Sequence, residues 1–329
     1  MSIAQPFQRD TSSLESASTE LWRRKPGTAI LFDNASHKSS AQSASRRAKE
    51  LLQTLADTGW HPRRIDAHGT GMEQALATLR ESDADLILGF GGDGTVAACA
   101  EIAVDRDLPL LPIPGGTMNL TAKDLGVWDA RSDLVDLSML GTEHVVDVAS
   151  VNGRMFLHSL ATGLVPAIGR QREAFRSRRG IAGRCAAIAD AARIALTLER
   201  QLIELRTGSL SARAKSLSIV VSNNRLVRHH DVDFSRASVD AGELGLYVST
   251  HRGPIGRYQL MQSLLTGQLE LDRKFHEASA HQVSLHAEDE SIAVSVDGEI
   301  STMRTPLVVT QRHRALRVIV PASHTGATS

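Results

Sequence analysis

The sequence predicts an α/β plus β fold: an N-terminal domain with a Rossmann-like parallel sheet, followed by a C-terminal antiparallel β-sandwich domain. Three observations support this prediction. Short apolar runs alternate with amphipathic helical segments from Thr28 onward, whereas the second half of the chain contains mostly short β-rich runs. The length of 329 residues also suits two domains of ~150 residues, each large enough to bury a core.

In the first half, apolar runs typical of buried strands are each followed by a segment with helical periodicity. This order predicts a parallel sheet with helices on both faces, and such sheets bind ligands at the carboxyl ends of their strands. We expect strands over 28–32, 64–67, 84–90 and 108–113, and helices over 43–55, 71–80 and 95–103.

The second half has the pattern of an antiparallel sandwich, and its Asn152-Gly153 pair predicts a type I′ hairpin turn. We divide the chain into a flexible tail (1–27), an N-terminal domain (28–141) and a β-rich domain (142–329) whose last strand packs back on the first domain. We expect strands over 143–151, 154–160, 217–221, 244–249, 283–285, 292–296, 307–310 and 316–320, and helices over 181–200 and within 255–265.

The composition excludes several classes of protein. The chain has 37 basic and 37 acidic residues, so its charge gives no reason to expect a nucleic-acid partner. Its two cysteines, Cys99 and Cys185, fit no metal or redox spacing, which favours a reduced, cytoplasmic protein. Residues 1–27 lack the apolar segment of a signal peptide, and no stretch approaches the ~20 apolar residues of a membrane span.

The first candidate site is the turn Gly91-Gly92-Asp93-Gly94-Thr95, between a predicted buried strand and a helix. Glycines there permit positive φ and let backbone N–H groups approach a ligand, and a helix start favours a phosphate. Asp93 would repel a phosphate, so it fits better as a contact to a hydroxyl, a ribose or hydrated Mg²⁺. Taken alone, the turn is also compatible with a simple helix cap.

Two further turns carry polar groups at strand ends. Pro114-Gly115-Gly116-Thr117-Met118-Asn119 follows the next strand, and its Thr117 comes 22 positions after Thr95, so the two glycine turns can face one crevice. Near the C-terminus, Asp297-Gly298-Glu299 follows a β-rich run and exposes carboxylates that can accept a proton from a hydroxyl. By itself, Asp-Gly is an ordinary hairpin signal.

The three turns, in this order, resemble those of the diacylglycerol kinase catalytic family, which includes diacylglycerol, sphingosine and bacterial YegS-like lipid kinases. The resemblance covers roughly residues 28–320 and implies a fold shared with NAD kinases. It implies that ATP with Mg²⁺ binds the N-terminal domain, and that the β-rich domain holds the lipid. Glu299 would accept the hydroxyl proton, with Asp297 and Asp93 as further catalytic residues. The implied nucleotide contacts are Asn34, Gly91, Gly92, Asp93, Gly94, Thr95, Gly116, Thr117 and Asn119.

The sequence departs from the family pattern at three places. Ala35 replaces the usual proline after Asn34, and Leu120 replaces an aspartate that often follows the second glycine turn. The family's Asp-Asp-Gly-Leu stretch, linked to a structural Mg²⁺ in the bacterial kinases, is replaced by Asp240-Ala241-Gly242-Glu243, which leaves Asp240 as the candidate ligand.

These features predict an ATP-dependent kinase that phosphorylates the hydroxyl of a diacylglycerol-like lipid or long-chain alcohol. An NAD kinase-like enzyme and a non-catalytic nucleotide- or lipid-binding module are the alternatives. We expect a cytoplasmic protein that visits the inner membrane face to reach its lipid. A basic segment is either a docking surface for anionic headgroups or a solvated helix start. Its arginines are Arg170, Arg172, Arg176, Arg178, Arg179 and Arg184.

Overall fold

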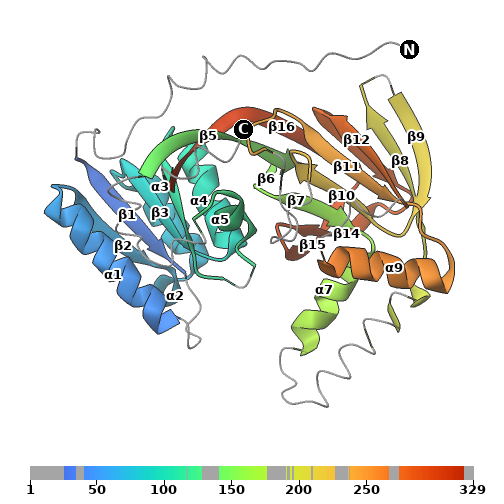
Figure 1. Ribbon diagram of the computed structural model, residues 1–329, viewed down its shortest axis with the longest axis horizontal. Helices are drawn as coiled ribbons and strands as arrows, with labels where there is room; N and C mark the ends of the chain where they lie inside the picture. Colours follow the sequence, from blue (N-terminus) through green and yellow to red (C-terminus); the bar gives the residue numbers. More distant parts are fainter. Residues whose placement is uncertain are drawn as a thin grey trace, which may run out of the picture.

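The computed structural model has the two-domain architecture predicted from the sequence, with a parallel α/β domain next to a β-sandwich (Figure 1). Within the described residues, no helix is both long and apolar enough to cross a bilayer. The structure describes residues 26–34, 41–116, 118–127, 141–175, 190, 193–194, 196–208, 210–226, 236, 238–266 and 274–321.

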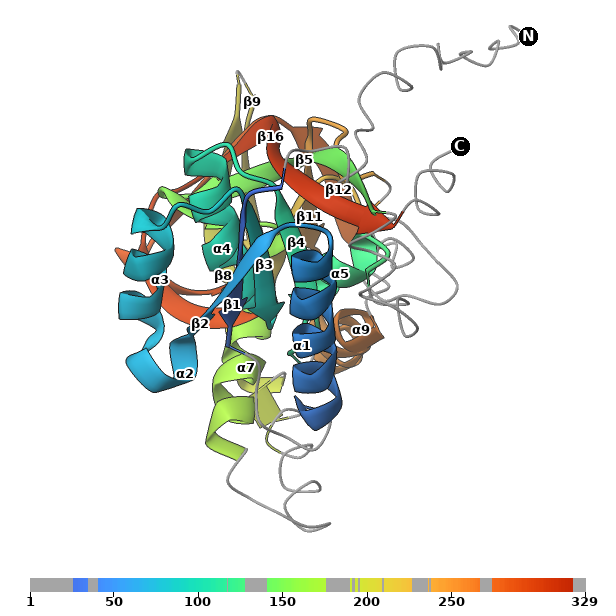
Figure 2. The ribbon, with the colours of Figure 1, turned by 90° about the vertical axis from the view of Figure 1, so that its left-hand side faces the viewer.

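The N-terminal domain is built on four parallel strands in the order β2-β1-β3-β4. Every residue of β3 is buried, as a strand covered on both faces requires. Figure 2 shows α1 on one side of this sheet and α3 on the other. The elements are β1 (Thr28–Asp33), α1 (Ala41–Asp57), β2 (His61–Asp66), α2 (Ala67–Thr70), α3 (Met72–Glu81), β3 (Leu86–Gly91), α4 (Asp93–Asp105), β4 (Leu110–Pro114) and α5 (Leu120–Asp124).

The C-terminal domain is a sandwich of two sheets with a shared apolar core. One sheet is continuous with the parallel sheet, because Val318 of β16 pairs with Leu110 of β4. The other has the order β12-β11-β10-β7-β14-β15. The elements are β5 (Gly141–Val151), β6 (Arg154–Phe156), β7 (Ser159–Thr162), α7 (Leu164–Phe175), β8 (Gln201–Thr207), β9 (Leu210–Ser216), β10 (Ile219–Asn223), β11 (Leu244–Ser249), α9 (Gly253–Thr266), β12 (Phe275–Ala280), β13 (Gln282–Ala287), β14 (Ser291–Val296), β15 (Glu299–Arg304) and β16 (Leu307–Pro321).

Both predicted hairpin signals form turns with left-handed backbone. Asn152 and Gly153 have φ of 48° and 86° between β5 and β6, and Asp297 and Gly298 have φ of 48° and 85° between β14 and β15. Positive φ at both central positions is the requirement of a type I′ turn, so the prediction for Asn152-Gly153 is confirmed.

Two expectations about the second half were wrong, and one helix was not predicted. The strand predicted over 154–160 is divided into β6 and β7, which belong to different sheets. The strands predicted over 307–310 and 316–320 are one long strand, β16, with an irregularity between Arg312 and Leu316. The helix α7 was not predicted, and residues 181–189 of the helix predicted over 181–200 lie outside the described residues.

Candidate active site between the two domains

The two glycine turns lie against each other at the carboxyl ends of β3 and β4. The N–H of Gly115 donates to the carbonyl of Gly91 at 2.8 Å. A Cβ added to Gly116 would lie 2.5 Å from the Cα of Gly92 and 3.0 Å from Oδ1 of Asn119, so no other residue fits there without displacing backbone. The two turns therefore lie together, as their spacing in the sequence predicts.

Close packing, rather than a left-handed backbone, accounts for Gly91 and Gly116. Gly91, Gly92, Gly94 and Gly116 do not have positive φ, which corrects the expectation from sequence. A Cβ on Gly91 would meet Thr95 at 2.6 Å, whereas one on Gly94 would meet only Oε2 of Glu299, at 3.7 Å. Gly94 is thus required by neither the backbone nor the packing within the domain.

The N-terminus of α4 lies where the sequence predicts an anion site. The 13-residue helix begins at Asp93 after Gly92, which provides no side-chain cap. The N–H groups of Thr95 and Val96 donate to the carbonyl of Gly92, so among the described residues those of Asp93 and Gly94 are left for a ligand. Asn34, at the end of β1, donates from Nδ2 to Oγ1 of Thr95 at 3.0 Å and so fixes its hydroxyl. Thr117 lies outside the described residues.

Asp93 occupies a partly buried position where α4 meets α5. Its Oδ1 accepts the N–H of Thr121 at 3.2 Å. Burial raises the pKa of the Asp93 carboxyl; the Thr121 N–H opposes this, the charge of Asp297 adds to it, and His158 opposes it. Asp297 and His158 belong to the C-terminal domain, so charged groups of that domain affect the pKa of Asp93 in the N-terminal domain.

We expect Asp93→Asn to raise the melting temperature near neutral pH. A carboxyl with a raised pKa in the folded state stabilises the protein below its unfolded pKa, and this contribution is lost as the pH rises through the raised value. Asparagine keeps an acceptor for Thr121 without a charge, so its advantage should vanish below about pH 4. Thermal unfolding of the two proteins against pH measures this, and a variant that melts at or below the wild-type temperature at neutral pH would contradict it.

The third turn is fixed by the carboxylate of Asp297. This side chain, 8% exposed, accepts N–H groups from Leu157 at 2.7 Å and from His158 and Ser159 at 2.9 Å each. These bonds explain why the predicted strand 154–160 is interrupted, because the N–H groups between β6 and β7 bind a side chain rather than a neighbouring strand. Asp297 thereby holds the turn that presents Glu299.

Glu299 lies at the start of β15 and faces the first turn of α4. Its side chain is 63% exposed, and its Oε2 lies 2.6 Å from Nη2 of Arg154 on β6. The same oxygen lies 3.7 Å from the position of a Cβ on Gly94, so the C-terminal domain brings this carboxylate to the N-terminal glycine turn. Arg154 was not predicted as a site residue; its position two residues after the Asn152 turn carries no recognisable signal.

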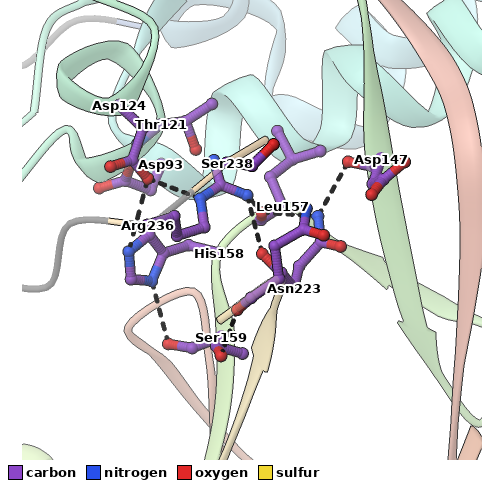
Figure 3. Close-up of polar contacts among 12 residues, drawn as sticks. Asp93, Thr121, Asp124, Asp147, Leu157, His158, Ser159, Asn223, Arg236 and Ser238 are labelled. Carbon is purple, nitrogen blue, oxygen red and sulfur yellow. Dashed lines mark hydrogen bonds and ion pairs between the residues drawn. The ribbon is translucent and has the colours of Figure 1, made fainter. Parts of the chain in front are cut away.

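A buried ion pair joins the domains beside this site (Figure 3). Nε of Arg236 lies 2.8 Å from Oδ2 of Asp124, at the end of α5, and both side chains are less than 5% exposed. Nη1 of Arg236 donates to the carbonyls of Leu157 at 2.8 Å and Asn223 at 3.1 Å. Nε2 of His158 lies 3.7 Å from the same Asp124 oxygen. These contacts connect the helix that binds Asp93 to the segment that binds Asp297.

Asp240 does not have the surroundings of a structural Mg²⁺ site. Its Oδ1 accepts from Oγ of Ser238 at 2.6 Å, and its Oδ2 lies 3.7 Å from Nη1 of Arg314. Across the described ranges, no group of three or more His, Cys, Asp or Glu could hold a metal ion. A guanidinium therefore supplies the positive charge beside this carboxylate, and the ion implied by the resemblance does not fit the residues present.

Comparison with known proteins supports a relationship to lipid kinases. Residues 29–151 match the family model of the diacylglycerol kinase catalytic domain. This segment is therefore similar to that catalytic domain. The matched segment includes the two glycine turns and β5, and it ends at the hairpin that leads to Arg154. The part of the chain that contains both glycine turns is thus similar to the catalytic domain of this kinase family.

Similar proteins extend the likeness beyond the matched domain. The chain is 23% identical over 246 residues to a Staphylococcus haemolyticus protein described as "Putative lipid kinase", covering 72% of this chain and 77% of that one. It is 30% identical over 83 residues to an Enterobacter protein described as "Probable lipid kinase YegS-like", covering 24% of this chain and 28% of that one. A Bacillus anthracis structure described as "a putative diacylglycerol kinase" has a TM-score of 0.66 at 20% identity, covering 91% of this chain and 98% of that one, which supports the fold.

Proposed function

We propose that this protein is an ATP-dependent lipid kinase that transfers the γ-phosphoryl group to the hydroxyl of a diacylglycerol-like lipid or long-chain alcohol. The observation that carries the proposal is the position of Glu299, whose carboxylate comes from one domain and lies 3.7 Å from a Cβ position on the glycine turn of the other. Phosphoryl transfer needs chiefly this kind of positioning of donor, acceptor and charge. A lipid substrate also places the protein, at least transiently, at the cytoplasmic face of a membrane.

The residues at the glycine turns fit a nucleotide. The backbones of Gly92 and Gly116 pack directly against each other, which brings the two turns together. The N-terminus of α4 beside them favours phosphate oxygens. Asn34 and Thr95 add an amide and a hydroxyl at the same edge, and Asn119 keeps the second turn in shape through bonds to Gly116 at 2.8 and 3.0 Å. When bound, ATP supplies the phosphoryl group, and Mg²⁺ neutralises its negative charge.

Glu299 is our candidate for the proton acceptor. Arg154 holds its Oε2, and within the described part of the chain no group bonds Oε1, which leaves this oxygen to accept the proton of a substrate hydroxyl. Asp297, whose two oxygens already accept three N–H groups, keeps Glu299 in position. Asp93, at the start of α4, is the carboxylate best placed to contact hydrated Mg²⁺ at the phosphates.

The decisive experiment is a phosphorylation assay with radiolabelled ATP. A panel of diacylglycerols, monoacylglycerols and long-chain amino alcohols is presented in mixed micelles, with NAD as a soluble acceptor. Transfer of label to a lipid supports the proposal and identifies the acceptor. Transfer to NAD alone would favour an NAD kinase-like enzyme, and ATP or lipid binding without transfer would favour a binding module.

We expect Gly94→Val to weaken nucleotide binding strongly in a folded protein. The space around a Gly94 Cβ is open except toward Glu299, so the fold tolerates the side chain, but valine would occupy the approach to the α4 N-terminus. ATP affinity should fall by about tenfold or more, or ~1.4 kcal/mol. Calorimetric titration measures it, and Gly69→Val, at a glycine with nothing within 4 Å, is the control. Unchanged ATP affinity would remove the glycine turn from the nucleotide site.

A further inference from the structure

The carboxylate of Asp147 is buried in a hydrogen-bond network where β5 lies beside β16 (Figure 1). Its Oδ1 accepts from Nδ1 of His313 at 2.9 Å and from the N–H of Arg314 at 2.7 Å. Its Oδ2 accepts from the N–H of Gly242 at 2.7 Å and from Nε2 of Gln311 at 3.1 Å. Each oxygen thus accepts two hydrogen bonds, which offset the cost of burying the charge.

An irregularity in β16 brings three of these four donors to Asp147. The register of β16 against β5 shifts between Arg312 and Leu316, and Arg314 has a φ of 48°. A bulge of this kind takes residues out of the regular ladder and redirects their side chains. The N–H of Arg314 and the ring of His313 therefore both reach the carboxylate on the neighbouring strand.

The same network holds the segment 238–243, where the resemblance places a structural Mg²⁺. The N–H of Asp147 donates to the carbonyl of Val239 at 2.8 Å. Gly242 has a φ of 77°, and a Cβ there would lie 3.0 Å from Nδ1 of His313, so the histidine ring packs directly on this segment. The segment is therefore fixed by contacts with both β5 and β16.

The chain's own donors occupy the carboxylate oxygens that a cation would need. Divalent cations such as Mg²⁺ and Ca²⁺ bind carboxylate oxygens. At Asp147 each oxygen already accepts two hydrogen bonds, so an ion could bind only by displacing these donors. At Asp240, the hydroxyl of Ser238 and the guanidinium of Arg314 lie beside the two oxygens, at 2.6 and 3.7 Å.

We propose that Gln311, His313 and Arg314 replace a structural cation in this chain, so that the segment 238–243 keeps its position without a divalent ion. The replacement extends to the contact between the domains. Nδ2 of Asn223 donates to the carbonyl of Asp147 at 2.8 Å, and the carbonyl of Asn223 accepts from Arg236, which pairs with Asp124 of the N-terminal domain (Figure 3). The arrangement of the two domains therefore does not depend on a divalent ion bound in this region.

The test is thermal unfolding of the full chain without nucleotide, in EDTA, in excess MgCl₂ and in excess CaCl₂. An ion that binds the folded state raises the melting temperature with its concentration, so the wild type should melt at the same temperature in all three buffers. Atomic emission spectroscopy of the purified protein should find no stoichiometric magnesium or calcium. Stoichiometric metal would overturn the proposal. So would a melting temperature that either ion raises in the wild type but not in Asp240→Asn.

Variants at the replacing side chains complete the test. Gln311→Ala/His313→Ala removes two donors from Asp147 and should melt about 5 °C or more below the wild type in EDTA. His313→Asn should melt close to the wild type, because its Nδ2 can take the position of Nδ1. His276→Ala, at an exposed histidine on β12, is the control and should also melt like the wild type. An unchanged melting temperature in the double variant would overturn the proposal. None of these readouts requires kinase activity, so a failure of the proposed function remains distinguishable.

Discussion

Glu299→Gln should lower the turnover of the lipid substrate by ~10²–10⁴-fold, the usual contribution of a general base. Glutamine keeps the size of the side chain and an oxygen that can accept from Arg154, but it cannot take a proton. Since Glu299 is 63% exposed and outside the apolar cores, the substitution should leave the fold intact. Steady-state kinetics with the lipid identified by the phosphorylation assay measure the effect.

A proton acceptor is recognised by a change in kcat that leaves the affinity for ATP unchanged. ATP affinity should stay near the wild-type value, because the glycine turns and α4 belong to the other domain. A loss confined to kcat indicates an interaction made chiefly in the transition state. Glu290→Gln, at an exposed glutamate of the same domain, is the matched control and should retain full turnover. Near-normal kcat in Glu299→Gln would remove the proton-acceptor role.

Periodicity predicted the fold where apolar residues repeat regularly. The buried strands β1, β3 and β4 and the helices α1, α3 and α4 were predicted, because each buries a continuous run or a single face. The short helix α2 was not predicted. The strands not predicted include β9, β12 and β15, which are the last strands at edges of their sheets. An edge strand is less covered, so its sequence need not alternate; in β12 only Phe275 is buried.

The turns of the candidate site were predictable because local sequence specifies them, whereas the contacts between distant segments were not. Asp93 and Asp297 were predicted from glycine-containing turns at strand ends. The Asp297 carboxylate accepts the N–H groups of Leu157, His158 and Ser159 because β7 lies beside β14. No local sequence pattern predicts this arrangement of the two strands. A resemblance to known kinases could identify the carboxylates but not this contact.

The ion pair between Arg236 and Asp124 should be the most costly interaction to break outside the apolar cores. Both side chains are less than 5% exposed, so removing one partner leaves an uncompensated buried charge. We expect Arg236→Met and Asp124→Leu each to lower the free energy of unfolding by ~3–5 kcal/mol. This is a large share of the ~5–15 kcal/mol that stabilises a typical domain. Urea denaturation measures the loss.

A double-mutant cycle separates this pair from ordinary packing. The variant Arg236→Met/Asp124→Leu removes both charges, so its loss should be clearly smaller than the sum of the two single losses. Recovery should be incomplete, because the carbonyls of Leu157 and Asn223 both lose the guanidinium donor, and only that of Leu157 keeps another, Nδ2 of Asn223. The exposed pair of Arg46 and Glu50 is the control, and Arg46→Met should cost no more than ~0.5 kcal/mol. Additive losses at Arg236 and Asp124 would show that this ion pair does not join α5 to the segment that Asp297 binds. The two halves of the site would then have to be coupled by the continuous sheet through β4 and β16.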